Sequence, residues 1–295
     1  MSAIFEQYRF SLLIERVNFQ CFLCDNDTII DSPDELDKIK VKIFKDALID
    51  EIKPGEDKIK GREYSFNLLE ENDDFICFLM NIRRNIKRQT CDFKTEQLDS
   101  WPAVWVFVDL AKQKIFMQKN SQAWEKTNTP VNVLVERIND RIFMKSLYCK
   151  VAPIKIKSSF WTIVNDNKGK IKSITFELIS PNMPDIYRSM QLDIKELRDN
   201  VGVKNTVVTL DAGTDSSLVV PENNDFINGA VSYTEEGGGN IKIRLKKVKG
   251  KKIIETNEQK RTTTVEFDDI SVKTTSPENV KKVLEIIKNT LSSDD

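Results

Sequence analysis

A segment in the last fifth of the sequence carries the densest group of side chains able to bind an anion. Between Lys242 and Lys252 there are seven cations in eleven residues and no acid. They are Lys242, Arg244, Lys246, Lys247, Lys249, Lys251 and Lys252. Like charges at this density repel one another unless something anionic neutralises them, and a phosphate backbone does so well. We therefore expect this segment to bind nucleic acid.

The spacing within this segment predicts a two-stranded ribbon. Residues 241–245 alternate apolar with cationic, as in a strand with one buried face, and Gly250 provides a turn. The segment has no aromatic residue to stack on bases, so contact is expected with phosphates, independent of sequence and sensitive to salt. The alternatives are a solvated edge strand, an acidic partner, or the chain's own acidic stretch at residues 203–237.

A second cationic group lies at the end of a predicted strand, residues 75–82. Its members are Arg83, Arg84, Lys87 and Arg88. These side chains could contact a phosphate backbone. The alternative is a solvated strand end, balanced by the acidic turn at residues 70–74.

Residue types restrict catalysis more than they suggest it. The chain has no histidine, which excludes Ser-His-Asp and Cys-His sites and histidine-ligated zinc. A magnesium-dependent nuclease built from carboxylates stays open, and Asp109 at a strand end would suit it. The Glu-x-Lys triplets that such a site needs lie in hydrophilic segments, so we predict no catalytic residue.

Cysteines and glycines give no sign of a metal or cofactor. Cys21 and Cys24 have metal-ligand spacing, but no second pair exists, and the residues between them look like core. The glycines at 237–239 fit the end of a helix and a tight turn. We predict neither metal nor cofactor, and reduced thiols.

Overall composition indicates an ordinary globular protein. The 295 residues are 40% hydrophobic and 31% charged, with a formal net charge of −1, so a polyanion site must be local. No apolar run approaches the length of a membrane span, and no signal peptide is recognisable. We expect a cytoplasmic protein that does not contact a membrane.

The strongest structural pattern is a β-hairpin at residues 101–118, where residues 103–108 are all apolar and so predict a strand covered on both faces. Further strands are expected near residues 8–15, 62–69, 75–82, 151–157, 171–180 and 206–210. Helices are expected at about 32–48, 129–147, 158–167, 184–200, 222–233 and 276–291.

These elements predict an α+β fold of mainly antiparallel sheets with helices packed on them. We expect two subdomains. The first, residues 1–150, is built on the hairpin at 101–118. The second, residues 151–295, ends in the basic β-ribbon and a terminal helix.

Several motifs after Ile171 resemble a bacterial family of unknown function that is encoded near phage-resistance and mobile-element genes. They are the strand ITFELISPN, the strand from Thr206 into an acidic loop, the helix ending in Tyr233 and glycines, and the basic strand pair before TVEF. The order of elements is also similar to the RexA phage-exclusion proteins. That similarity implies a dimeric DNA binder without sequence specificity.

Together these observations predict a component of a bacterial anti-phage defence system that binds nucleic acid, DNA rather than RNA, through the basic ribbon. A homo-oligomer and a co-encoded protein partner are expected. A metal-dependent nuclease effector and a protein-protein interaction subunit of a defence complex are the alternative functions.

Overall fold

Antiparallel β-strands dominate the computed structural model of the chain, which confirms the predicted α+β class. The structure describes residues 2–14, 33–53, 55–59, 62–89, 91–142, 147–156, 159–179, 203, 205–214, 216–246, 253–256, 260–266 and, in the last stretch, 281–282, 285–286 and 289–290. No helix within these residues is long and apolar enough to cross a membrane.

The chain divides into two compact units, each assembled from separate parts of the sequence. The first unit contains Met1–Glu6, Lys45–Ile138 and Thr262–Asp295, and the second contains Gln7–Phe44 and Asn139–Arg261. The second unit therefore interrupts the first, whereas the sequence predicts two consecutive subdomains that meet at residue 150. Pairing of the first strand with the last strand produces this arrangement, and sequence patterns do not report such distant pairing.

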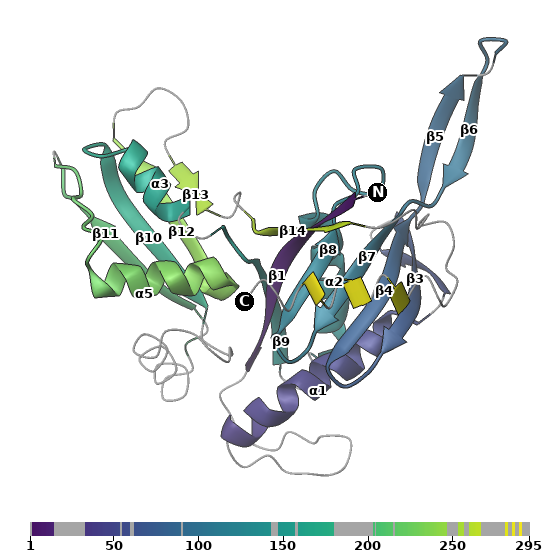
Figure 1. Cartoon of the computed structure of the whole chain (residues 1–295), viewed down its shortest axis with the longest axis horizontal. Helices are drawn as coiled ribbons and strands as arrows, with labels where there is room; N and C mark the ends of the chain where they lie inside the picture. Colours follow the sequence, from purple (N-terminus) through teal and green to yellow (C-terminus); the bar gives the residue numbers. More distant parts are fainter. Residues whose placement is uncertain are drawn as a thin grey trace. The chain divides into compact units, whose positions relative to one another are not determined.

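The first unit is built on an antiparallel sheet (Figure 1) whose strand order is β14-β1-β8-β7-β4-β3-β2. Its strands are β14 (Thr262–Glu266), β1 (Ser2–Ile14), β8 (Lys114–Gln118), β7 (Ala103–Asp109), β4 (Phe75–Ile82), β3 (Arg62–Glu71) and β2 (Gly55–Ile59). Both predicted hairpins are present, as β7–β8 and β3–β4. Within β1, Ser2 to Glu6 pairs with β14.

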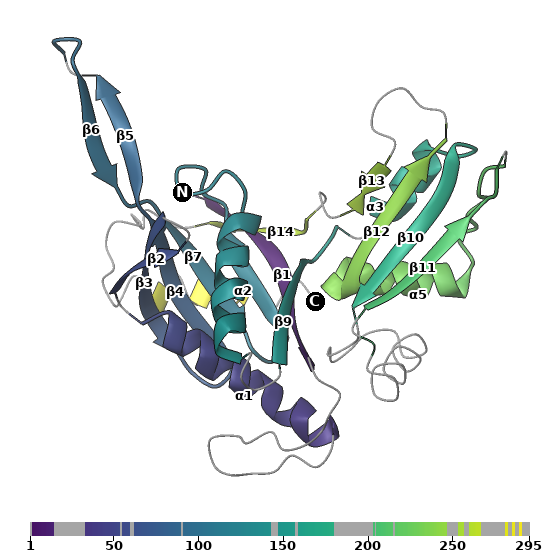
Figure 2. The same cartoon turned by 180° about the vertical axis from the view of Figure 1, so that it is seen from behind.

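The centre of this sheet is apolar on both faces, as the all-apolar run in β7 predicts. On one face Phe107 contacts the rings of Phe5, Phe75 and Trp105, and Ile286 of the helical C-terminal residues packs against the same cluster. Figure 2 shows helix α2 (Asn128–Ile142) across the other face. This helix ends before residue 147, where the sequence predicts its end.

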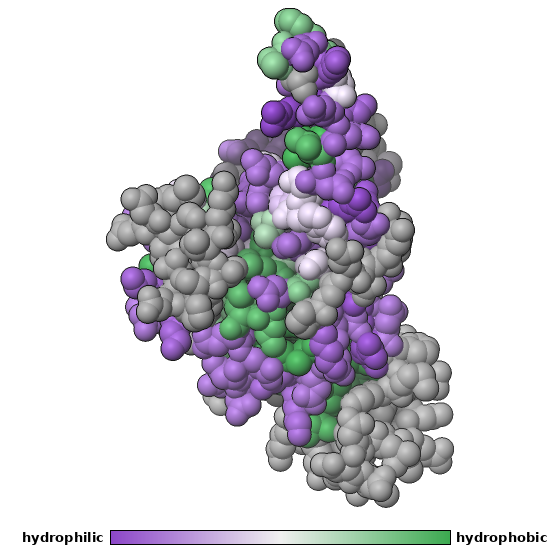
Figure 3. Space-filling view, turned by 90° about the vertical axis from the view of Figure 1, so that its right-hand side faces the viewer, coloured by the Kyte–Doolittle hydropathy of each residue, from purple (hydrophilic) through white to green (hydrophobic). Residues whose placement is uncertain are grey.

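A separate two-stranded sheet extends from the first unit (Figure 1). It consists of β5 (Arg84–Gln89) and β6 (Thr95–Ser100), and we call it the arm. Nearly all its side chains are exposed, and Phe93 in the connecting turn has a φ of 60°. Figure 3 shows that the arm is largely hydrophilic, with hydrophobic atoms at its tip. The sequence does not predict β6, because TEQLDS lacks a buried face.

In the second unit, β1 continues from Tyr8 to Ile14 and pairs with β9 (Leu147–Pro153). A four-stranded antiparallel sheet follows, in the order β11 (Asn205–Asp211), β10 (Ile171–Ile179), β12 (Gly239–Leu245) and β13 (Ile253–Glu255). Helices α3 (Ser159–Asp166) and α5 (Asp225–Tyr233) lie on one face of this sheet (Figure 2).

The core of the second unit joins this sheet to its two helices. Phe176 on β10, Ile241 and Ile243 on β12, and Phe160 on α3 are fully buried together. Helix α1 (Pro33–Glu51) begins and ends close to the predicted positions. The helix predicted at 184–200 lies outside the described residues.

The stacked rings around Phe107 should dominate the stability of the first unit. We expect Phe107→Ala to lower the free energy of unfolding by about 3–5 kcal/mol, because it removes a fully buried ring and leaves a cavity. Urea denaturation would measure the loss. Phe93→Ala is the matched control: Phe93 is 84% exposed, so stability should hardly change. Equal effects of the two substitutions would contradict the packing described.

Candidate nucleic-acid interface

Strand β12 has the alternation that the sequence predicts. Ile241, Ile243 and Leu245 are buried in the core, whereas Lys242 and Arg244 lie on the face of the sheet opposite α3 and α5. Successive side chains of a strand point to opposite faces, so hydrophobic burial of one set fixes the direction of the other. The first cations of the basic segment are therefore held outward by the core.

Acidic side chains lie on the same face of the sheet. Lys242 Nζ is 2.6 Å from a carboxylate oxygen of Glu177, and Glu255 is its cross-strand neighbour on β13. The hydrogen bond to Glu177, together with the charges of both acids, raises the pKa of Lys242. Both Lys242 and Glu177 keep 37% side-chain exposure, so this pair forms at the surface and is not buried.

Arg244 and Asp211 lie on this face at the end where β10 begins. Arg244 pairs with Ser173 on β10, and Ser173 pairs in turn with Asp211 on β11. The pKa of Asp211 is lowered, first by a hydrogen bond from the Gly213 N–H and further by the charges of Lys172 and Arg244. The acids supplied by neighbouring strands thus offset part of the positive charge of β12, which the linear sequence does not reveal.

The rest of the basic segment is described only at its start. Lys246 is half-buried, and its backbone N–H donates to the carbonyl of Lys170 at 2.7 Å. Lys247, Lys249, Lys251 and Lys252 lie outside the described residues, as does the turn at Gly250.

The second cationic group divides into anchoring and exposed members. Arg83 pairs with Glu63 at 2.5 Å and with Asp99 at 2.6 Å, and these hydrogen bonds raise its pKa. Arg84 donates twice to the carbonyl of Ala123. Both arginines therefore fasten the base of the arm.

Lys87 and Arg88 are exposed on β5, within the arm. They belong to the first unit, whereas β12 belongs to the second. The two cationic groups that the sequence predicts therefore belong to different units of the chain.

Other residues considered for chemistry have structural partners. The Asp109 carboxylate accepts a hydrogen bond from the Lys112 backbone N–H at 2.7 Å and so closes the β7–β8 turn. In the described ranges, no group of three or more cysteines and carboxylates is arranged to hold a metal ion. Cys77 and Cys149 are buried, and burial raises the pKa of the Cys149 thiol. Cys21 and Cys24 lie outside the described residues.

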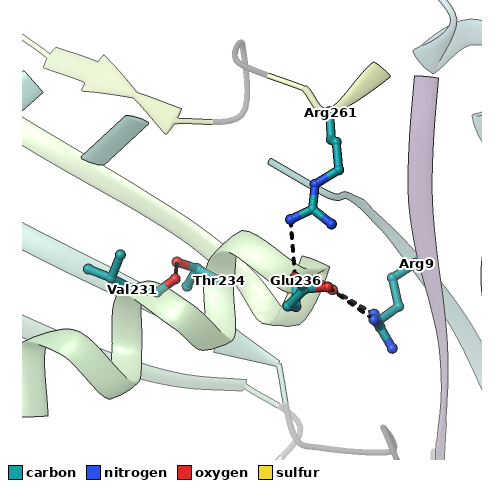
Figure 4. Close-up of polar contacts among 5 residues, drawn as sticks. All are labelled: Arg9, Val231, Thr234, Glu236 and Arg261. Atoms are coloured by element: carbon teal, nitrogen blue, oxygen red, sulfur yellow. Dashed lines mark hydrogen bonds and ion pairs between the residues drawn. The ribbon is translucent and has the colours of Figure 1, made fainter. Parts of the chain in front are cut away.

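Sequence reasoning missed a buried group of charges in the second unit. Arg9 on β1 is only 7% exposed, and its guanidinium reaches both the backbone carbonyl of Glu236, at 2.6 Å, and the Glu236 carboxylate, at 3.3 Å. Arg261 binds the other oxygen of that carboxylate at 3.1 Å (Figure 4). Burial lowers the pKa of Arg9, and the charge of Glu236 opposes that shift.

Lys155 is fully buried beside the same turn. Its Nζ donates to the carbonyl of Gly239 at 3.0 Å, and its backbone N–H donates to the carbonyl of Glu235 at 2.7 Å. Burial lowers the pKa of Lys155 to about 7, although Glu235 and Glu177 raise it in part. The sequence places Lys155 among alternating strand residues, where a lysine normally faces solvent, so it gives no sign of this burial.

The turn that serves both cations needs its glycines. It follows α5 as a short π-helix (Thr234–Gly238) and leads directly into β12. At Gly237, where φ is 89°, an added Cβ would lie 2.7 Å from the Cβ of Arg9. At Gly239 an added Cβ would lie 2.0 Å from the carbonyl oxygen of Glu177. The glycines therefore permit close backbone approach as well as the turn that the sequence predicts.

Comparisons with protein-family models, curated proteins and solved structures yield no match for this chain. The residues themselves therefore carry the argument.

The buried ammonium of Lys155 should make stability depend on pH. In the unfolded chain a lysine keeps a pKa of about 10.4. Between about pH 7 and that value the folded protein gives up a proton that the unfolded chain retains, so stability should rise with pH across this window. Lys155→Met should remove this gain. Urea midpoints of both proteins from neutral to alkaline pH would show it, and parallel curves would contradict it.

A pair of glycine substitutions isolates the contact with Arg9. Gly237→Ala and Gly169→Ala both place a side chain in left-handed backbone, at φ of 89° and 74°, which costs about 1–2 kcal/mol each. Only Gly237→Ala adds a clash, because nothing lies within 4 Å of a Cβ at Gly169. We expect a larger loss of unfolding free energy for Gly237→Ala. Equal losses would show that the turn relaxes freely.

Proposed function

We propose that this chain binds nucleic acid without sequence specificity, as a non-catalytic component of a bacterial anti-phage defence system. The residues proposed to contact the backbone are Lys242, Arg244, Lys246, Lys247, Lys249, Lys251 and Lys252. DNA is preferred to RNA in this proposal. A co-encoded protein partner and self-association belong to the same proposal.

One observation supports the proposal best: Lys242 and Arg244 lie on the sheet face opposite α3 and α5 while their apolar neighbours in β12 are buried. The described part of the basic segment is thus fixed to the core of the second unit and cannot turn inward. A rigid strand loses less side-chain and backbone entropy on binding than a flexible tail. The four lysines that follow extend the positive charge along the chain.

The acids on this face shape the expected binding. Glu177, Glu255 and Asp211 reduce the positive field near Lys242 and Arg244, so affinity should be modest and confined to low salt. A phosphate that approaches Lys242 competes with Glu177 for the same ammonium. Binding by this face therefore depends on the further cations of residues 246–252, a stretch whose sequence contains no acid.

The proposal predicts salt-sensitive binding that does not depend on base sequence. If about four phosphates are neutralised, a plot of the logarithm of the association constant against the logarithm of the salt concentration should have a slope of about −3.6. The triple variant Lys242→Gln, Arg244→Gln, Lys246→Gln should weaken binding at least about tenfold and flatten the slope. Gel-shift titrations of duplex DNA and RNA at several salt concentrations would measure both effects.

The matched control is Lys53→Gln, Lys119→Gln, Lys126→Gln, which removes the same charge from exposed lysines of the first unit and should bind normally. Unchanged binding by the first triple variant would refute the proposed surface. Cleavage of the nucleic acid in Mg²⁺ or Mn²⁺ would favour the nuclease instead. Absence of binding at every salt concentration, with a neighbouring gene product co-purifying, would favour a protein-protein subunit.

A further inference from the structure

One face of the arm carries a pair of apolar side chains next to a pair of opposite charges, and each pair is formed across the two strands. Ile86 pairs with Leu98 and Arg88 pairs with Glu96. Alternate residues of paired strands share a face, so these four side chains lie together. Ile86 is 49% and Leu98 is 44% exposed, which is unusual for directly opposed apolar residues.

The charges beside this apolar pair are not used within the described structure. Arg88 and Glu96 stand opposite each other, yet neither takes part in a hydrogen bond or ion pair there. On this face β5 carries Arg88 and β6 carries Glu96, whereas Lys87 and Asp99 belong to the other face. Each strand therefore contributes one exposed charge to this face, a cation from β5 and an acid from β6.

This face of the arm is complementary to the same face of a second copy of the chain. A two-fold axis parallel to the strands, between two facing arms, sets β5 of one copy over β6 of the other. Arg88 then faces the partner's Glu96, and Ile86 faces the partner's Leu98. A two-fold axis across the strands would oppose β5 to β5 and repel. A nucleic-acid backbone would meet Glu96 beside Arg88 and is disfavoured here.

We propose that the arm is a self-association surface, through which two copies pack face to face with their strands parallel. The base of each arm is already held by Arg83 and Arg84, so little order is lost when two arms meet. In this arrangement both tips lie at the same end. Phe93, 84% exposed, can then pack on its counterpart.

The size of the contact sets its strength. Two six-residue strands cover about 20 Å by 10 Å, roughly 200 Å² per copy, compared with about 800 Å² per partner in standard interfaces. The association is therefore weak and concentration-dependent. It would raise avidity for an extended polymer by joining two basic segments.

The test is a charge exchange between two variants. Arg88→Glu carries two acids at the contact, and Glu96→Arg carries two cations, so each should dimerise at least about tenfold more weakly than the unaltered protein. Mixed together, the two variants set the paired carboxylates of one copy against the paired guanidinium groups of the other and should form heterodimers. Sedimentation velocity over a range of concentrations would measure every state.

The mixture separates contact between copies from effects within one arm, because each variant keeps its like-charged pair within the arm throughout. The control variants Lys87→Glu and Glu125→Lys have the same net charges as the test variants but leave the proposed contact unchanged, so each alone and their mixture should dimerise like the unaltered protein. The proposal is overturned if the unaltered protein stays monomeric at the highest concentration, if Arg88→Glu dimerises normally, or if the paired variants fail to associate. None of these outcomes depends on nucleic-acid binding by β12.

Discussion

Two cations buried in the second unit set the conditions that its fold must meet. A buried guanidinium or ammonium is costly unless oxygen atoms surround it. Arg9 and Lys155 find those oxygens at one short turn and the residue that follows it: the Arg9 guanidinium binds the carboxylate and carbonyl of Glu236, and the Lys155 ammonium donates to the carbonyl of Gly239. The backbone can present so many acceptors only because α5 ends there in a π-helical turn with glycines. The burial of these cations in the second unit therefore depends on the backbone conformation of this turn.

This turn also determines where the exposed cations lie. Gly239 is the first residue of β12, so the strand that carries Lys242 and Arg244 starts at the carbonyl held by Lys155. Glu177 interacts with both a buried and an exposed cation: its charge raises the pKa of buried Lys155 in part, and its carboxylate pairs with exposed Lys242. The Glu177 carboxylate therefore couples the charge of buried Lys155 to that of Lys242 at the surface.

Local pattern predicted the elements with a buried face, and it missed those without one. The runs in β4, β7 and β10 and the alternation in β12 were recognisable because burial selects residue type at a regular period. The arm was not predicted from the sequence, because neither of its strands has a buried face. Lys155 and Arg9 could not be distinguished from surface residues, since their burial depends on a turn that lies far away along the chain. The acids opposite β12 were hidden for the same reason: strand register joins Glu177 to Lys242.

Pairing of β1 with β14 brings Ser2 beside Glu266, although the two residues are far apart along the chain. During synthesis β1 consequently has no partner along this edge until Thr262–Glu266 has left the ribosome. The strands of the four-stranded sheet in the second unit, β10 to β13, are synthesised before β14 and pair with one another. The order of synthesis therefore favours formation of this four-stranded sheet while the edge of β1 is still open.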